Sequence, residues 1–278
     1  MAALGQALAY LRAPTNALGF ALRRRGLPLR RIPQLKNESK QDLFSYLPEA
    51  EAAVLAARER DLRARYQLQG FRRASTRLDY RDGLWRIAAL ETALEGVSPP
   101  RVRRVVDVGS KNFSYVLPLL HFVRHWSGQR DFELHGVEVD PGGVYVDGHT
   151  RAEYAAAYLR QAGAGEIHFM DFLDFDLGPV DLLTWFFPFV TREALLWWGL
   201  PLKLFRPGRL LDHALALLAP GGILLAVHQT PREQALWCDL LEARGLVPLC
   251  TVRVASRLTH TYQRATGRRA TVLRRALS

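Results

Sequence analysis

After residue 100 the sequence alternates short apolar runs with longer stretches of helical spacing, and this alternation constrains the fold more than any other feature. The apolar runs cover residues 104–108, 133–137, 166–169, 182–185 and 222–227. Such alternation is typical of βαβ units, whose strands lie parallel in one sheet. Two further runs, 247–254 and 270–273, have no long helix between them, so they can pair as an antiparallel hairpin. We therefore expect an α/β fold with a mostly parallel sheet and flanking helices.

The residues before this region divide into two parts. The run GVSPP at 96–100 breaks both helices and strands, so we place a boundary there. Residues 41–100 carry apolar side chains at three- and four-residue spacing, which predicts a helical N-terminal extension. Residues 1–40 form a basic arm in which three prolines interrupt any long helix. The remaining residues, 101–278, form the main domain.

The charged residues are unevenly distributed along the chain. Residues 1–104 hold 20 Lys or Arg against 10 Asp or Glu, residues 105–250 hold 11 against 17, and residues 251–278 hold 7 against none. Basic ends favour an anionic partner such as nucleic acid, a membrane surface or an acidic substrate. We expect the basic ends to meet near the substrate entrance, through Arg23, Arg24, Arg25, Arg268 and Arg269.

Several classes of protein are disfavoured by the composition. Charged residues interrupt every apolar run before it reaches the roughly 18 residues of a membrane-spanning helix. At the N-terminus the charges follow the apolar part, unlike in a secretory signal, so we expect a cytoplasmic protein. Cys238 and Cys250 are the only cysteines. We therefore expect neither a disulfide framework nor a metal site.

The first expected strand ends in a turn that suits a ligand. The run VVDVG at 105–109 is followed by an expected helix from Val116 to His125. At the carboxyl end of a parallel strand the chain must reverse sharply, and the next helix offers unpaired N–H groups. Gly109 at this turn lets a ligand approach the backbone. The turn is therefore the candidate cofactor site.

Four elements in order resemble the class I (Rossmann-like) methyltransferases that depend on S-adenosylmethionine (SAM). Asp107 lies two places before Gly109, where that family has an acidic residue, and Glu138 ends the second strand, where a carboxylate accepts hydrogen bonds from the ribose. Asp171, after the third strand, is similar to the family's adenine-contacting Asp. The run LAPGG at 218–222 resembles the segment before the family's fifth strand. The resemblance implies SAM as cofactor, bound by Asp107, Gly109, Ser110, Lys111, Asn112, Glu138, Asp171 and Phe172.

The turn differs from the family at two positions. Lys111 and Phe113 stand where the family usually has its second and third glycines. We expect Lys111 to lie beside the methionine carboxylate, and Asn112, which tolerates positive φ, to replace a glycine. A nicotinamide dehydrogenase would need three spaced glycines here, so that class is disfavoured. The altered turn leaves one alternative open, a non-catalytic binding protein with a methyltransferase-like fold.

The acceptor side of the site is less defined. Trp185, Phe186 and Phe187 are candidates for substrate binding, although aromatic side chains at strand ends often pack in the core. The Asn/Asp-Pro-Pro of amino-group methyltransferases and the Cys of cytosine C5 methyltransferases are absent from this segment. His149, His213 and His228 are candidate bases, and His228, after the fifth strand, is the best placed of them and is also a candidate for substrate binding. A lone histidine is more often structural, so we assign no catalytic residue.

The resemblance implies a SAM-dependent methyltransferase that aligns an acceptor with the methyl group and excludes water. Two acceptor classes stay open. The basic ends favour structured RNA, because RNA recognition combines Arg contacts to phosphate with aromatic stacking. The aromatic run at 185–189 favours an anionic or aromatic small molecule.

Overall fold

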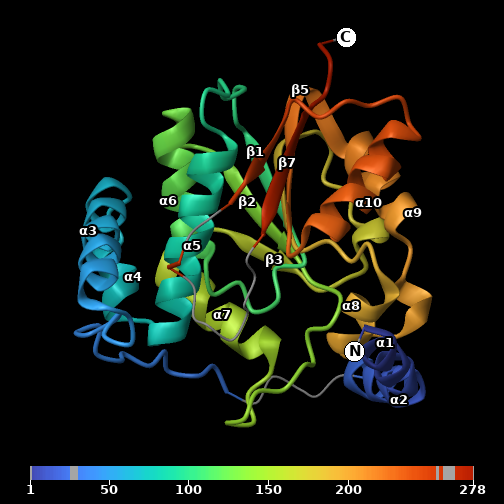
Figure 1. Ribbon diagram of the computed structural model, residues 1–278, viewed down its shortest axis with the longest axis horizontal. Coiled ribbons are helices and arrows are strands. Elements are labelled where there is room, and N and C mark those ends of the chain that lie inside the picture. The colour runs from blue at the N-terminus through green and yellow to red at the C-terminus, as the bar shows by residue number, and fades with distance from the viewer. Residues whose placement is uncertain (1, 26–30, 255–256, 259–266, 278) are drawn as a thin grey trace.

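The computed structural model describes residues 2–25, 31–254, 257–258 and 267–277. At its centre is a seven-stranded sheet in the order β3-β2-β1-β4-β5-β7-β6 (Figure 1). Strands β1 to β5 are parallel, and β7 is antiparallel to both β5 and β6. The strands are β1 (Arg104–Val108), β2 (Glu133–Val137), β3 (Glu166–His168), β4 (Val180–Phe186), β5 (Leu218–His228), β6 (Cys250–Arg253) and β7 (Arg269–Arg274). This is the predicted Rossmann-like, mostly parallel sheet with flanking helices, and the predicted antiparallel pairing of the last two strands is confirmed.

The bounds of β1 and β2 agree with the sequence prediction, whereas β5 begins four residues earlier than residue 222. The reason is a register shift in its pairing with β4, where Leu218 pairs with Val180 and Ile223 with Leu182. The glycines of LAPGG therefore lie inside the strand. A Cβ on Gly222 would lie 2.8 Å from the carbonyl oxygens of Val180 and Ala219, so this close approach requires glycine.

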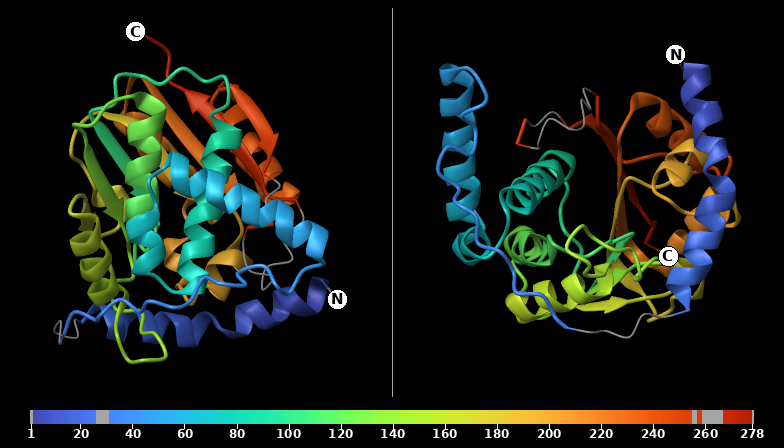
Figure 2. Two further views of the ribbon diagram at one scale, coloured as in Figure 1. Left: turned by 90° about the vertical axis from the view of Figure 1, so that its left-hand side faces the viewer. Right: turned by 90° about the horizontal axis from the view of Figure 1, so that it is seen from below.

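Helices cover both faces of the sheet (Figures 1 and 2). On one face lie α5 (Arg77–Ala93), α6 (Val116–Ser127) and α7 (Arg151–Ala162), with α3 (Glu49–Arg65) and α4 (Gln69–Arg73) outside α5. On the other face lie α9 (Pro207–Leu217) and α10 (Pro231–Glu242). Each layer encloses its own hydrophobic core, one containing Trp85 and the other Trp237.

The N-terminal region is helical, but residues 41–47 form turns. The periodic side chains Trp85, Ala88 and Ala89 belong to α5 and are buried. Because α5 packs against α6 and against the last two strands, it is part of the main layered body. None of the helices in the described ranges is long and apolar enough to cross a membrane.

The arm forms two short helices, α1 (Ala2–Leu11) and α2 (Ala13–Arg24), with Pro14 in the first turn of α2. Both lie across one end of the molecule, beside α8 (Arg192–Trp197) (Figure 2). Phe20 of α2 is buried with Leu195 and Leu200. The side-chain amide of Asn16 donates a hydrogen bond of 2.8 Å to the carbonyl oxygen of Leu196. The arm is thus packed against the protein.

Candidate functional site

The loop between β1 and α6 has the backbone of a glycine-rich turn. Gly109, Lys111 and Phe113 have φ angles of +74°, +56° and +50°, a region that residues other than glycine rarely adopt. The prediction that Asn112 takes positive φ was wrong. The amides of Gly109 and Ser110 both donate to the carbonyl oxygen of Val137, and this anchors a turn in which every second residue is left-handed.

The side chain of Phe113 points into the core and leaves the ligand side of the loop free. Its ring lies against Gly136 of β2, where a Cβ would come within 2.9 Å of the ring and 2.7 Å of the Ser110 hydroxyl. By contrast, a Cβ on Gly109 would meet no atom within 4 Å. The bulky residue at the third glycine position is therefore accommodated by a glycine on the neighbouring strand, and the space over Gly109 stays open.

Asp107, in strand β1, holds the β1–α6 loop in place. Its carboxylate accepts hydrogen bonds from the Tyr115 hydroxyl at 2.6 Å and the Thr184 hydroxyl at 2.7 Å, and the residue is fully buried. Burial raises the pKa of this carboxyl, while the two hydroxyl groups and the nearby Arg86 act in the opposite direction. Ser110, also fully buried, donates to the backbone oxygen of Asp107. These contacts hold the turn in shape.

Glu138 lies at the carboxyl end of β2, as predicted for a ribose-binding carboxylate. One oxygen accepts from the backbone N–H of Lys111 at 2.8 Å, and the other accepts from the N–H of Asp140 at 2.8 Å. The Arg151 guanidinium lies 3.4 Å from the second oxygen. Burial raises the pKa of Glu138, and Arg151 with the two amides partly offsets that effect. Glu138 therefore ties the β1–α6 loop to the end of β2.

The Lys111 cation takes part in no described ion pair, while the longer-range charges of Asp79 and Asp82 favour its charged form. Its ammonium lies 5.6 Å from the ring centre of Tyr145 and 5.7 Å from that of Trp198. It has no hydrogen-bond or ion-pair partner among the described residues, and the rest of the sequence contains no Asp or Glu that could supply one. Burial lowers the pKa of Lys111. The site thus holds a largely desolvated positive charge.

The arm is joined to this region by ion pairs. Arg23 of α2 binds both carboxylate oxygens of Asp140, at 2.9 and 3.0 Å, and Arg151 lies 3.3 Å from one of them. Asp140 is almost fully buried. A Cβ on Gly142 would lie 2.7 Å from the carbonyl oxygen of Arg23, so the loop after β2 needs glycine to admit α2. The arm therefore docks directly beside Glu138.

Asp171 and Phe172, the predicted adenine contacts, lie after β3. Asp171 caps the short helix η1 (Phe172–Asp174) by accepting from the Leu173 amide at 3.1 Å, and it also forms an ion pair with Arg206. Phe172 is buried, with its ring edge-on to Trp185. The Asp171 carboxylate remains partly exposed at the same edge of the sheet.

The aromatic run at the end of β4 divides between the two cores. Trp185 packs between Phe172 and Trp237, and Phe186 packs beside Trp85 on the opposite face. Phe187 has a φ of +64° and stacks on Trp85, and the Arg268 guanidinium lies 5.1 Å from its ring centre. Of the three candidates, Phe187 alone is partly exposed. It is the one best placed to meet an acceptor.

The three candidate bases occupy different environments. His228 is fully buried, neither of its ring nitrogens has a hydrogen-bond partner in the described structure, and burial lowers its pKa to about 3. A neutral imidazole packed against Trp237 is a structural residue. His213 contacts the carbonyl oxygen of Phe175 at 2.8 Å, and His149 faces Glu153 at 3.5 Å. None of these contacts indicates a catalytic base.

Two residues that shape the site, Tyr145 and Arg151, were not predicted from the sequence. They come from a loop and a helix start, and the fold brings them to Lys111 and Glu138, where Trp198, at the end of α8, also lies. One local sequence feature indicates where Arg151 lies. Arg151 follows Thr150, which forms a capping box with Glu153 and so fixes where α7 begins.

No family model and no curated protein matches the sequence. Solved structures of similar fold include a SAM-dependent methyltransferase from Aquifex aeolicus, which is 15% identical over 68% of this chain and 92% of that one, with a TM-score of 0.47. The N-methyltransferase NodS from Bradyrhizobium japonicum in complex with S-adenosyl-L-homocysteine is 13% identical over 78% and 98%, with a TM-score of 0.45. The [4+2]-cyclase SpnF is 15% identical over 70% and 82%, with a TM-score of 0.47. These similarities concern the fold alone.

Proposed function

We propose that this chain, which has a Rossmann-like methyltransferase fold, is a SAM-dependent methyltransferase whose cofactor binds over the β1–α6 loop. The observation that carries the proposal is Lys111, a desolvated ammonium with no anionic partner among the described residues. An unpaired charge is costly to bury, so a ligand that brings a negative charge would relieve that cost. The methionine part of SAM carries a carboxylate that suits this role.

The surrounding residues fit the other parts of such a ligand. The open space over Gly109 admits it to the backbone. The Glu138 oxygen that accepts the Lys111 amide keeps one lone pair for a ribose hydroxyl, whereas the other oxygen already accepts from the Asp140 amide and from Arg151. Asp171 is partly exposed and could meet the adenine amine. The proposed contacts are thus Gly109, Lys111, Glu138 and Asp171, while Asp107, Ser110 and Asn112 support the loop.

The chain would contribute alignment and exclusion of water. When bound, SAM supplies a methyl group on a sulfonium centre, which an acceptor nucleophile attacks in line. The docked arm and the rings of Tyr145 and Trp198 would limit access of water to the site. No general base is required where the acceptor is already a good nucleophile, because orientation then supplies most of the rate.

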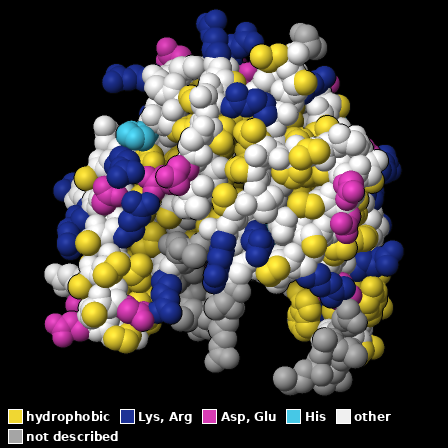
Figure 3. All heavy atoms as spheres, turned by 45° about the horizontal axis from the view of Figure 1, so that its top comes forward, with side chains coloured by type: hydrophobic (Ala, Val, Ile, Leu, Met, Phe, Trp, Pro, Cys, Tyr) yellow, Lys and Arg dark blue, Asp and Glu magenta, His cyan; other side chains and the backbone are white. Residues whose placement is uncertain are grey.

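For the acceptor, we propose an anionic or aromatic small molecule ahead of RNA. Many arginines of the N-terminal third are paired with acids, as in Arg58–Asp61, Arg63–Glu59 and Arg86–Asp82. Figure 3 shows one face on which Lys and Arg stand at separate places among apolar and acidic side chains. Neither observation favours a continuous phosphate-binding surface. RNA binding that weakens steeply as salt rises would instead favour the nucleic-acid acceptor.

A titration with SAM tests the proposed cofactor. We expect calorimetry to show one site with an affinity in the micromolar range and a rise in Tm, because SAM would bind the folded state. NADH, which belongs to the competing dehydrogenase class, serves as the control and is expected to give neither signal. Absence of heat and of any thermal shift at millimolar SAM would contradict the proposal.

One observation favours the second candidate, a non-catalytic binding protein. Glu138 and Asp171 already have protein partners, two amides and Arg151 for the first, and Arg206 with the Leu173 amide for the second. In that case Lys111 would receive a different anionic ligand. The SAM titration separates the two candidates, because the second predicts no SAM binding with the fold intact.

A further inference from the structure

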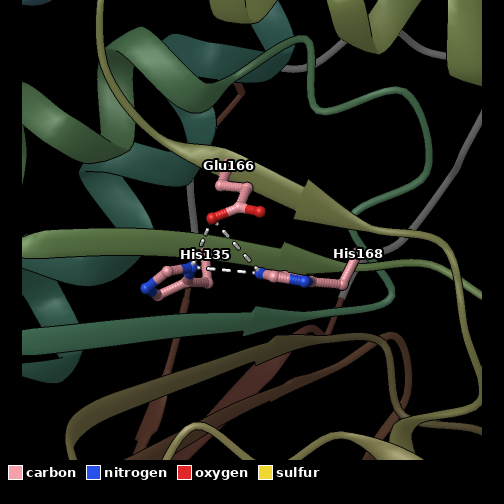
Figure 4. Close-up of side chains that lie close together, drawn as sticks. All are labelled: His135, Glu166 and His168. Atoms are coloured by element: carbon pink, nitrogen blue, oxygen red, sulfur yellow. Dashed lines mark hydrogen bonds and ion pairs between the residues drawn. The ribbon is translucent and has the colours of Figure 1, made fainter.

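Three potential metal ligands gather on one face of the β2–β3 pair (Figure 4). The Nδ1 atom of His135 lies 3.1 Å from the Nε2 atom of His168. A carboxylate oxygen of Glu166 lies 3.7 Å from the first of these nitrogens and 3.8 Å from the second. Across the described part of the chain, this is the one group of three or more such side chains whose ligand atoms meet so closely.

The backbone fixes this arrangement. Parallel pairing places His135 opposite Glu166 and Val137 opposite His168. Side chains two residues apart on a strand point to the same face, so Glu166 and His168 both lie on the side of His135. Because β3 is the edge strand, the group is buried at His135 and open to solvent at Glu166.

The distances suit a four-coordinate metal ion. With ligand bonds of about 2.0–2.1 Å and a tetrahedral angle, the ligand atoms would lie roughly 3.3–3.5 Å apart. The three observed separations, 3.1, 3.7 and 3.8 Å, lie on both sides of that range. Two imidazoles and one carboxylate are ligands that zinc accepts, and a fourth position would remain for water at the exposed side.

The opposite side of His135 carries a second, independent feature of metal-binding histidines. Its Nε2 atom faces the Glu133 carboxylate at 3.5 Å, and Arg104 holds that carboxylate at 2.7 Å. A metal-binding histidine commonly directs its other ring N–H at a carboxylate, which orients the ring and selects the tautomer. Here no hydrogen bond joins Nε2 to Glu133, but a proton on Nε2, facing that carboxylate, would leave the lone pair of Nδ1 for a metal ion beside His168 and Glu166. A hydrogen bond between the two imidazoles alone would give Glu166 no role.

We propose that His135, Glu166 and His168 bind a divalent transition-metal ion of the zinc class, which ties the edge strand β3 to β2. The sequence alone did not predict this site, because its ligands come from two strands and the expectation of no metal site rested on the cysteines. The amide of Glu138 donates to the carbonyl oxygen of His168 at 3.0 Å, so the ion would stiffen the strand pair that carries Glu138. The proposal does not depend on the identity of the cofactor.

The test uses the full chain after treatment with a chelator, titrated with Zn²⁺ by calorimetry and with Co²⁺ by visible absorption. We expect one ion per chain, the absorption of tetrahedral Co²⁺, and a rise in Tm with Zn²⁺. His168→Ala should weaken binding by about 100-fold or more, since loss of an outer-shell partner alone costs 10- to 100-fold. Glu166→Ala, at an exposed side chain, should weaken it without harming the fold.

The matched control is His125→Ala, which removes an exposed histidine of α6. It should bind the metal as the parent does. The proposal is overturned if the parent binds Zn²⁺ no more tightly than His168→Ala and Glu166→Ala, or if His125→Ala weakens binding as much as they do. If His168→Ala does not fold, Glu166→Ala alone decides by the same comparison.

Discussion

Two groups of polar side chains lie along strand β2, one at its carboxyl end and one near its middle. The first contains a cation that lacks an ion-pair partner, and the second contains potential metal ligands that lack a cation. At the carboxyl end of β2, Glu138 and Asp140 are surrounded by amides and arginines, while the nearby Lys111 forms no ion pair in the described structure. Three residues earlier, His135 meets His168 and Glu166, a set of potential ligands for a cation. The first group is suited to an anionic ligand and the second to a metal ion.

The difference shows that burial of acids does not by itself mark a ligand site. Asp107 and Asp140 are among the most buried acids of the protein, yet hydroxyl groups and arginines satisfy both. They hold the loop and the arm in place. A ligand is expected beside a buried polar group that has no hydrogen-bond or ion-pair partner. At the carboxyl edge of the sheet that group is Lys111.

Replacing Asp107 should cause the largest loss of stability. Asp107→Ala leaves the buried hydroxyl groups of Tyr115 and Thr184 without their acceptor and removes a negative charge near Arg86. We expect the free energy of unfolding to fall by about 3–5 kcal/mol, as when a buried polar network loses one partner. Urea unfolding of the parent and of the variant measures this difference in the free energy of unfolding. A loss below about 1 kcal/mol would show that the network does not anchor the loop.

The ion pair between the arm and β2 should contribute less, because Arg23 is partly exposed. Asp140→Ala is expected to reduce the free energy of unfolding by about 2 kcal/mol and to expose α2 to trypsin. Arg24→Ala is the matched control, since Arg24 is exposed and contacts only the Phe20 ring within the described structure. Equal sensitivity of the two variants to trypsin would mean that the Arg23–Asp140 pair does not hold the arm.

His228 should behave as a buried structural histidine. Burial lowers its pKa to about 3, below the unfolded value near 6.5, so folding disfavours its protonated form. Its contribution is fully present above about pH 6.5 and is lost as the pH falls toward 3, at up to about 1.4 kcal/mol per pH unit. His228→Leu should flatten that slope in urea unfolding at a series of pH values. An unchanged slope would show that His228 finds a partner when protonated.

Removing the Lys111 charge should slightly stabilise the protein. Lys111→Met deletes a desolvated cation that has no anionic partner in the described structure, and we expect the free energy of unfolding to rise by about 1 kcal/mol. Lys111→Gly should gain a similar amount, because glycine adopts the φ of +56° without strain. If both variants are less stable than the parent, the ammonium is satisfied and cannot mark a ligand site.

Hydrophobic periodicity predicted the succession of strands along the chain, because apolar runs of strand length alternate with helix-length segments. It placed β1 and β2 correctly, since Arg104 and Gly109 bound the first run and two glutamates bound the second. It missed the start of β5, which depends on pairing with Val180 rather than on local sequence. The expectation that Lys111 faces a ligand carboxylate stays a prediction, and its environment supports it.

Other parts of the site could not be predicted from local sequence. Arg23 and Asp140 are 117 residues apart, so only the folded chain brings them together. His135 and His168 lie on different strands and meet through strand register. The packing of the Phe113 ring depends on the absence of a side chain at Gly136. In each case the decisive information lies in tertiary contacts.

The role of Lys111 is tested most directly by measuring the binding of SAM and of 5′-methylthioadenosine to the parent protein and to Lys111→Met. SAM carries the methionine carboxylate, whereas 5′-methylthioadenosine keeps the adenosine and the S-methyl group as a neutral thioether and lacks the chain that bears the amino and carboxylate groups. By calorimetry, Lys111→Met should weaken SAM binding by about 10- to 100-fold, the equivalent of one charge-assisted hydrogen bond. It should leave 5′-methylthioadenosine binding unchanged. Equal SAM affinity in parent and variant, or equal losses for both ligands, would contradict the claim that Lys111 is the counter-ion of the cofactor carboxylate.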